Sequence, residues 1–312
     1  MNKHKLCPFV FDYEHRLFDR SAIVNANCFE WLRRVPEAVI HAVVTDPPYG
    51  VKEYEPEQME KRANNNGGIW RQPPCFDGHK RSPLPRFTAL NPSERIRIQQ
   101  YFSEWAGLVF MVLRPGGHMF LASNAFLSHL VFSAIAEQGF EFRGQIIRLV
   151  RTLRGGDRPK NAEEEFADVC TMPRSCYEPW GIFRKPMVNG MKVSDCLKEF
   201  QTGGLRRRSD GNPFQDVVKS ERTSRKERDI ANHPSLKPQS FLREIVYSSL
   251  PLGKGIVLDP FMGSGSTVAA AEAVGYFCIG IERMKEYFDM GRESVPKLSR
   301  IITEDRQLRF AA

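Results

Sequence analysis

Four consecutive residues, Asp46, Pro47, Pro48 and Tyr49, follow an apolar stretch at residues 38–45 and combine groups suited to one kind of chemistry. If the stretch is a parallel strand, the four residues lie at its carboxyl end, where open α/β sheets bind ligands. The amino group of a nucleobase is a poor nucleophile because its lone pair is delocalised into the ring. A carboxylate and a carbonyl held rigid by two prolines can accept its two hydrogens, and Tyr49 can stack on a flipped base. The alternative interpretation is a plain strand-to-loop turn, because Asp-Pro and Pro-Pro are common in turns.

A second segment, VLDPFMGSGSTVAAAEAVGYFCIGIE at residues 257–282, is typical of a strand, a tight glycine turn, a small-residue helix and another strand. Gly263 and Gly265 allow close backbone approach to a ligand, and the following helix start offers free N–H groups. Glu282 ends the second strand, where an acid can accept hydrogen bonds from ribose hydroxyls. No lysine follows the glycines, so the segment is not a P-loop. The alternative is a plain βαβ unit without a ligand.

Together, DPPYG at residues 46–50 and LDPFMGSGST at residues 258–267 resemble the amino-group-specific DNA methyltransferases. The catalytic motif precedes the cofactor motif, an order that resembles the circularly permuted β group of that family. HPSLKP at residues 233–238 resembles the segment before the cofactor strand, which helps to bind the methionine end of the cofactor. The family usually has aspartate where Asn27 stands.

The resemblance implies S-adenosylmethionine as cofactor and assigns a role to each matching position. The catalytic positions are Asp46, Pro47, Pro48 and Tyr49. The cofactor positions are Asn27, Asp46, His233, Lys237, Asp259, Pro260, Phe261, Gly263, Ser264, Gly265 and Glu282. No metal is implied. The expected reaction is methyl transfer to the N6 amino group of adenine in DNA, because aspartate at the first motif position tends to accompany adenine in the family, and serine cytosine.

Several other functions are compatible with parts of the sequence. The first is an N4-cytosine DNA methyltransferase, which uses the same pair of acceptors. Methyltransferases of protein glutamine or RNA resemble the chain less, since they usually carry Asn-Pro-Pro-Tyr and the unpermuted order. A carbon-5 cytosine enzyme needs a cysteine nucleophile, and Cys75 lies in a proline-rich segment rather than at a strand end. A DNA-binding regulator without catalysis belongs to another class, and the intact motifs argue against it.

These motifs need a sheet to position them, and the remaining pattern of strands and helices predicts one. We expect strands at 21–27, 38–46, 118–124, 140–150, 255–261 and 276–282. We expect helices at 93–113, 126–138, 239–250 and 267–274, and from about 284, with Ser93 as the first N-cap and Pro115-Gly116-Gly117 ending that helix. Residues 52–91, which include Lys61, Arg62, Trp70 and Arg71, are rich in Asn, Gly and Pro and are expected to be a loop over the base or the DNA. The predicted fold class is α/β, a doubly wound Rossmann-like methyltransferase sheet.

Residues 151–232 break this pattern and are expected to form an irregular basic insert that recognises the target sequence. The expected organisation is therefore a catalytic half at 1–150, the insert, and a cofactor-binding half at 233–312. The candidate DNA-binding residues are Arg206, Arg207, Arg208, Arg222 and Arg225. Such side chains neutralise phosphates and reach base edges. Because acids are interspersed, a solvated mixed-charge surface is the alternative interpretation.

Composition is consistent with a polyanionic partner. The formal net charge is +8, and 41% of the 312 residues are hydrophobic. The expected partner is double-stranded DNA, with a homodimer and a cognate restriction endonuclease left open. No apolar run is long enough to span a membrane, and we expect a cytoplasmic, nucleoid-associated protein. The seven cysteines are scattered without a CxxC pair and are expected to be reduced thiols.

Overall fold

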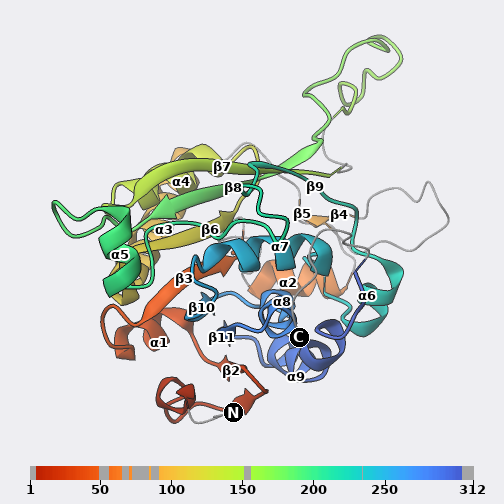
Figure 1. The fold of residues 1–312 in the computed structure, drawn as a ribbon. Helices are drawn as coiled ribbons and strands as arrows, with labels where there is room; N and C mark the ends of the chain where they lie inside the picture. The colour runs from red at the N-terminus through yellow and green to blue at the C-terminus, as the bar shows by residue number, and fades with distance from the viewer. Residues whose placement is uncertain are drawn as a thin grey trace.

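The computed structural model describes residues 5–48, 56–64, 70–71, 84–85, 91–150, 156–233 and 235–303. In these ranges one sheet has nine strands in the order β1-β2-β11-β10-β3-β6-β8-β7-β9 (Figure 1). Its strands are β1 (His15–Leu17), β2 (Ser21–Asn25), β3 (Ile40–Thr45), β6 (Leu113–Ala122), β7 (Glu141–Leu149), β8 (Tyr177–Arg184), β9 (Val217–Lys219), β10 (Ile256–Asp259) and β11 (Phe277–Glu282). The neighbours β2, β11, β10, β3 and β6 pair in parallel, whereas β8 runs antiparallel to both β6 and β7.

Helices cover both faces of this sheet. The first face packs against α1 (Cys28–Arg34), α3 (Pro92–Val112) and α4 (Ser128–Ala136), and the second against α7 (Gln239–Ser249), α8 (Ser266–Val274) and α9 (Lys285–Leu298). Successive strand residues point to opposite faces, so Val43 joins the first core and Val44 the second. A strand buried on both faces is mostly apolar, as β3 is, and its two polar residues, His41 and Thr45, make buried hydrogen bonds. The predicted α/β fold class is confirmed.

The chain leaves the adjacent strands β10 and β3 in opposite directions. From β10 it passes through α8 to β11, and from β3 through α3 to β6, with α8 and α3 on opposite faces. This reversal is the topological switch point of an open α/β sheet, where a crevice opens beyond the carboxyl ends of the strands. Asp46 follows β3 and Asp259 ends β10, so both candidate motifs meet there. No helix in the described ranges has the length and apolarity needed to cross a bilayer.

The prediction of a loop throughout residues 52–91 is wrong in its first part. Helix α2 (Pro56–Ala63) lies within it, with proline at the start and a Glu57–Lys61 ion pair one turn apart. Two short strands, β4 (Trp70–Arg71) and β5 (Leu84–Pro85), pair with each other. Residues 49–55, 65–69, 72–83 and 86–90 lie outside the described residues, and so does the predicted role of Tyr49.

The predicted ends of the first long helix also need correction. Asn91, not Ser93, is the N-cap of α3, because its side chain accepts a hydrogen bond from the Glu94 backbone while the Glu94 side chain accepts one from the Asn91 backbone. The helix ends at Val112 rather than at Pro115-Gly116-Gly117. Those three residues belong to the start of β6, where the pairing with β3 shifts register.

The segment predicted to be irregular, residues 151–232, contributes a central strand to the sheet. Strand β8 lies between β6 and β7, and the segment also holds α5 (Val193–Glu199), β9 and α6 (Arg225–Ile230). Pro179 and Gly181 disguise β8, since both residue types are disfavoured in strand interiors. Residues 156–176 form an arm that projects from the body between β7 and β8 (Figure 1).

Candidate active site

Asp46 and Asp259 lie side by side at the switch point, and Thr45 joins their strands. Thr45 is the last residue of β3, and its Oγ1 donates a hydrogen bond of 2.7 Å to Asp259 Oδ1 on β10. The sequence motif did not single out Thr45, although its place directly before Asp46 in a fully buried strand was a usable signal. The two halves of the site are therefore locked together by a buried polar contact.

Asp259 is almost fully buried, and burial raises the pKa of its carboxyl to about 6. Hydrogen bonds from Thr45, Thr267 and the Phe261 backbone oppose that rise, while the charge of Asp46 adds to it. An acid with three donors in a dry position is held in one orientation. Asp259 is thus preorganised beside Asp46, as its predicted cofactor role requires.

The turn after β10 is built around two glycines and an acid. Gly263 and Gly265 have φ of +53° and +84°, a left-handed conformation that favours glycine. A Cβ on Gly265 would lie 2.5 Å from Val295 Cγ2, so this glycine is also required for packing against α9. Glu282 accepts hydrogen bonds from the backbone N–H groups of Gly263 at 3.0 Å and Met284 at 2.8 Å. Burial raises the pKa of Glu282 to about 7.

Other predicted cofactor positions surround this turn. Ser264 is buried, and its Oγ has no hydrogen-bond partner among the described residues, which leaves it available to a ligand. His233 stacks edge-on against Tyr287 with ring centroids 4.4 Å apart, and a Cβ on Gly263 would lie 3.0 Å from the His233 ring. Phe261 packs against Trp105. The structure therefore brings these positions together, and it adds Tyr287, for which the sequence offered no signal.

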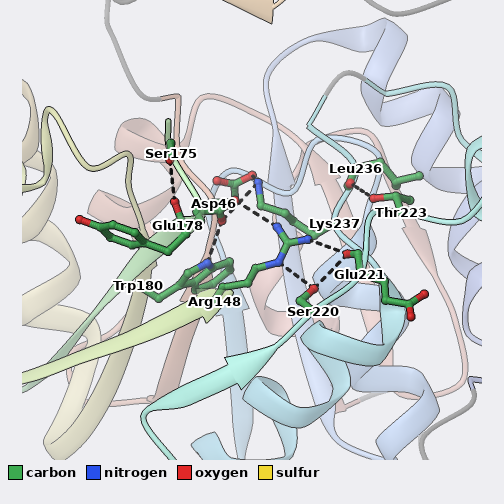
Figure 2. Close-up of polar contacts among 11 residues, drawn as sticks. Asp46, Arg148, Ser175, Glu178, Trp180, Ser220, Glu221, Thr223, Leu236 and Lys237 are labelled. Carbon is green, nitrogen blue, oxygen red and sulfur yellow. Dashed lines mark hydrogen bonds and ion pairs between the residues drawn. The ribbon is translucent and has the colours of Figure 1, made fainter. Parts of the chain in front are cut away.

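Lys237 contacts two carboxylates at the site. Its Nζ donates a 2.5 Å hydrogen bond to Asp46 Oδ2 and lies 3.6 Å from Glu178 Oε1 on β8 (Figure 2). Only 7% of Lys237 is exposed. The resemblance placed Lys237 at the cofactor, and that contact stays a prediction; among the described residues Lys237 contacts the carboxylates of Asp46 and Glu178.

Glu178 and Arg148 continue this line of charges and were missed by the sequence analysis. Arg148 on β7 faces Glu178 on β8 across the ladder, with Nη1 3.0 Å from Oε2. Trp180 Nε1 donates to Glu178 Oε1 at 2.8 Å. Arg148 also donates to Ser220 Oγ at 2.9 Å and to the Glu221 carbonyl at 3.4 Å (Figure 2). Nothing in the sequence around Glu178 indicated that its side chain reaches the site.

Asn27 and the prolines complete the predicted set. Asn27 is the N-cap of α1 and accepts a hydrogen bond from the Phe29 backbone at 2.9 Å, a role that aspartate would also fill. Its cofactor contact stays a prediction. Pro47 is buried and Pro48 half-buried directly after β3, while Pro260 follows Asp259.

The structure does not bring Arg206 and Arg208 to the site. Arg206 donates to the Tyr276 hydroxyl at 2.6 Å and stacks over Tyr247 at 4.3 Å. Tyr276 directly precedes β11, so this contact lies at the amino ends of the strands, opposite the carboxyl-end crevice. Arg208 lies 3.8 Å from Asp210 and 3.9 Å from Glu244, with its side chain 13% exposed. Sequence clustering predicted a DNA contact, but these two side chains serve packing and ion pairing.

The remaining three arginine candidates are exposed, but only two of them lie near the site. Arg207 is exposed and donates to the Gly211 carbonyl at the same end as Arg206. Arg222 and Arg225 are exposed near Ser220 and Glu221, the segment that Arg148 holds beside the site. Thr223, between them, donates to the Leu236 carbonyl next to Lys237. Of the five predicted arginines, Arg222 and Arg225 therefore lie on the segment attached to the site.

The fold and this site define a class. A doubly wound sheet presents a glycine turn, a strand-end acid and an acid–proline–proline segment at one switch point, an arrangement for holding a nucleoside-bearing cofactor against a second substrate.

Comparison with known proteins agrees with that class. Residues 40–293 match the DNA methylase family of N6 and N4 enzymes. The chain is 24% identical to Type II methyltransferase M.HindIII of Haemophilus influenzae, covering 84% of this chain and 90% of that protein. It is 22% identical to Type II methyltransferase M2.DpnII of Streptococcus pneumoniae, covering 88% and 89%.

Two solved structures share the fold. The M1.HpyAVI complex with S-adenosylmethionine has a TM-score of 0.52 at 17% identity and covers 88% of this chain and 98% of that one. The cytosine-N4-specific PvuII DNA methyltransferase has a TM-score of 0.56 at 14% identity, covering 90% and 92%. The chain belongs to the DNA methylase family, and the predicted class of enzyme, a DNA methyltransferase, is confirmed.

Proposed function

We propose that the protein transfers a methyl group from S-adenosylmethionine to the N6 amino group of adenine in double-stranded DNA, after the base has flipped out of the helix. The observation that carries this proposal is the meeting of Asp46 with the Asp259–Glu282 cofactor half at one switch point, locked by the Thr45–Asp259 hydrogen bond.

The described residues fit the proposed cofactor. Glu282 is an acceptor for ribose hydroxyls. The buried hydroxyl of Ser264 makes no hydrogen bond to the other described residues and can bind the ligand. The left-handed turn at Gly263 lets the backbone approach the ligand closely. By the family resemblance, Asp259 would contact the methionine portion of the cofactor and Phe261 its adenine. When bound, S-adenosylmethionine supplies a methyl group activated by its sulfonium sulfur.

The chain's own residues prepare the amino group. Asp46 and the Pro47 carbonyl each accept one of its hydrogens, which turns the nitrogen lone pair out of the ring plane toward the methyl carbon. Two prolines restrict the backbone there, so the acceptors need little reorganisation during the reaction. As the new C–N bond forms and the methyl–sulfur bond breaks, the nitrogen loses one N–H proton, for which the Asp46 carboxylate would be the acceptor. Positioning of this kind is worth several kcal/mol of barrier, on the order of 7–11 in the best cases.

The choice of adenine rests on Asp46. In the family, aspartate at this position tends to accompany adenine, and serine cytosine. The fold does not decide between the bases, since a cytosine-N4-specific enzyme shares it. To test the choice, purified protein is incubated with labelled cofactor and unmethylated plasmid, and the DNA is digested to nucleosides for mass analysis. Label in N6-methyladenine is expected, whereas label only in N4-methylcytosine would overturn the adenine assignment alone.

DNA recognition is proposed for residues 217–225 within the 151–232 region. Arg222 and Arg225 are exposed and basic, and their segment is attached to the site through Arg148 and Thr223. A homodimer and a cognate restriction endonuclease are further proposals. Sedimentation of the protein with and without DNA tests the first, and co-purification of a nuclease activity from the source cells tests the second.

A further inference from the structure

Four charged side chains of alternating sign form a continuous line from residues 217–225, proposed above to recognise DNA, to the carboxylate of Asp46. The order is Arg148, Glu178, Lys237 and Asp46, with nitrogen–oxygen distances of 3.0, 3.6 and 2.5 Å (Figure 2). The exposed fractions of the side chains are 6%, 15%, 9% and 15%. Two positive and two negative groups leave the line formally neutral, so the attraction between neighbouring charges offsets the desolvation penalty of burying them.

Glu178 is fixed independently of the lysine that it faces. Its Oε2 is held by Arg148 across the β7–β8 ladder, and its Oε1 by the Trp180 indole. Trp180 itself is fully buried and packs against Phe241. The carboxylate is therefore a rigid negative group presented by the sheet.

Lys237 lacks such rigidity. A lysine side chain has four rotatable bonds, and its ammonium has three donors without a fixed plane. With Asp46 as its only acidic neighbour, the ammonium could follow any rotation of that carboxylate. A second carboxylate on the other side restrains Nζ, and Nζ in turn restrains Asp46 Oδ2.

We infer that Glu178 is a positioning residue for methyl transfer, which acts through Lys237 to orient Asp46, and that Arg148 couples this orientation to the 220–221 segment. The inference rests on the proposed role of Asp46. It assigns no contact between Glu178 and either substrate, so the expected loss is in the methyl-transfer step rather than in binding.

The ladder contains a matched control. Glu141 and Arg184 form a second directly cross-strand pair between β7 and β8, with Arg184 Nη2 2.6 Å from Glu141 Oε2, at the opposite end of the same ladder. Glu178→Gln and Glu141→Gln thus remove the same charge from the same kind of pair. The only intended difference is the connection to Lys237.

The experiment is single-turnover methyl transfer at saturating cofactor and DNA, together with cofactor Kd and Tm. Glu178→Gln should slow methyl transfer on the order of 10- to 100-fold with cofactor Kd unchanged, since small misplacements of a catalytic group have effects of this size. Glu141→Gln should leave the rate unchanged. Because Glu178 acts through Lys237, Glu178→Gln should have little further effect in a Lys237→Met background, as double-mutant cycles detect.

Two outcomes would overturn the inference: equal rates for both Gln variants and the native protein, or effects of Glu178→Gln and Lys237→Met that simply multiply. If Glu178→Gln fails to fold, the double variant Arg148→Met/Glu178→Met replaces the pair with apolar side chains of similar length and should fold. It must still lose methyl transfer. Asp46→Ala separates the two proposals. If the Asp46→Ala variant stays active, the proposed function is wrong. If it is inactive while Glu178→Gln has the native rate, only the inference about Glu178 is overturned.

Discussion

Thr45 Oγ1 donates to Asp259 Oδ1 at 2.7 Å, and this one contact joins the strand that presents Asp46 to the strand that begins the cofactor turn. Both residues are almost fully buried. Substrate base and cofactor must approach within van der Waals distance during methyl transfer, so the relative position of these two strands bears directly on the reaction.

The first prediction concerns this contact. Thr45→Val keeps the shape of the side chain but removes a donor to buried Asp259, so the free energy of unfolding should fall by about 1–3 kcal/mol at pH 8. The pKa of Asp259, already raised to about 6, should rise further. An acid with a raised folded pKa is penalised when ionised, so the loss should shrink as the pH falls from the variant's higher pKa to about 6, and should be smallest below 6. Urea unfolding at pH 8 and pH 5 measures both effects.

Thr45→Ser is the control, because it retains the hydroxyl. It should lose only the small contribution of one methyl group, with no pH dependence. Equal destabilisation of the Val and Ser variants at both pH values would show that the hydroxyl contributes nothing.

The second prediction separates catalysis from cofactor binding. Asp46→Ala should abolish methyl transfer while cofactor Kd stays largely intact, since the cofactor turn lies on β10 and β11. The change also leaves the buried ammonium of Lys237 without its nearest carboxylate, which lowers stability. Asp46→Ala/Lys237→Met should therefore recover Tm without recovering activity. Calorimetric cofactor binding and a filter assay of DNA methylation provide the measurements; near-normal turnover by either variant contradicts the catalytic assignment.

The third prediction divides the arginines. Arg222→Ala/Arg225→Ala should weaken DNA binding and reduce the slope of log Kd against log salt by about 1 for each DNA phosphate that the variant no longer neutralises. Arg206→Ala should leave that slope unchanged but lower the free energy of unfolding by about 1–3 kcal/mol, because it removes the stacking on Tyr247 and the bond to Tyr276. Fluorescence anisotropy across a salt series distinguishes them, and a flatter slope for Arg206→Ala would restore the original assignment.

The sequence predicted the parts of this site that are contiguous along the chain. Asp46 and the turn from Asp259 to Gly265 were identified because each motif combines its residues within one short segment after a strand. Strand β8 was missed because it contains Pro179 and Gly181, residue types that are rare inside strands. Glu178 was missed along with β8, because its place at the site depends on contacts with Arg148 and Lys237, which lie in other segments of the chain.

The arginine cluster illustrates a second limit of sequence reasoning. Three adjacent arginines are a strong charge signal, but a sequence does not tell which way each side chain points. Arg206 contacts Tyr247 and Tyr276, and Arg208 pairs with Glu244. These partners all lie later in the chain. Lys237 was found through the family resemblance, but its contacts with Asp46 and with Glu178 on β8 depend on elements distant in the sequence.

The last prediction is a pH dependence of cofactor binding. Burial raises the pKa of Glu282 to about 7, so below that pH the cofactor-free protein carries a proton on this carboxyl. An ionised carboxylate accepts hydrogen bonds from ribose hydroxyls more strongly than a neutral carboxyl does, so cofactor binding favours release of the proton. Affinity should therefore rise with pH and level off above 7, with Kd falling by up to about tenfold from pH 6 to pH 8. Calorimetry in two buffers of different ionisation enthalpy counts the protons directly, and a fraction of a proton, at most about 0.9, should be released at pH 6. Glu282→Gln should bind more weakly and lose this proton release, whereas equal release by both proteins would assign the titration to another group.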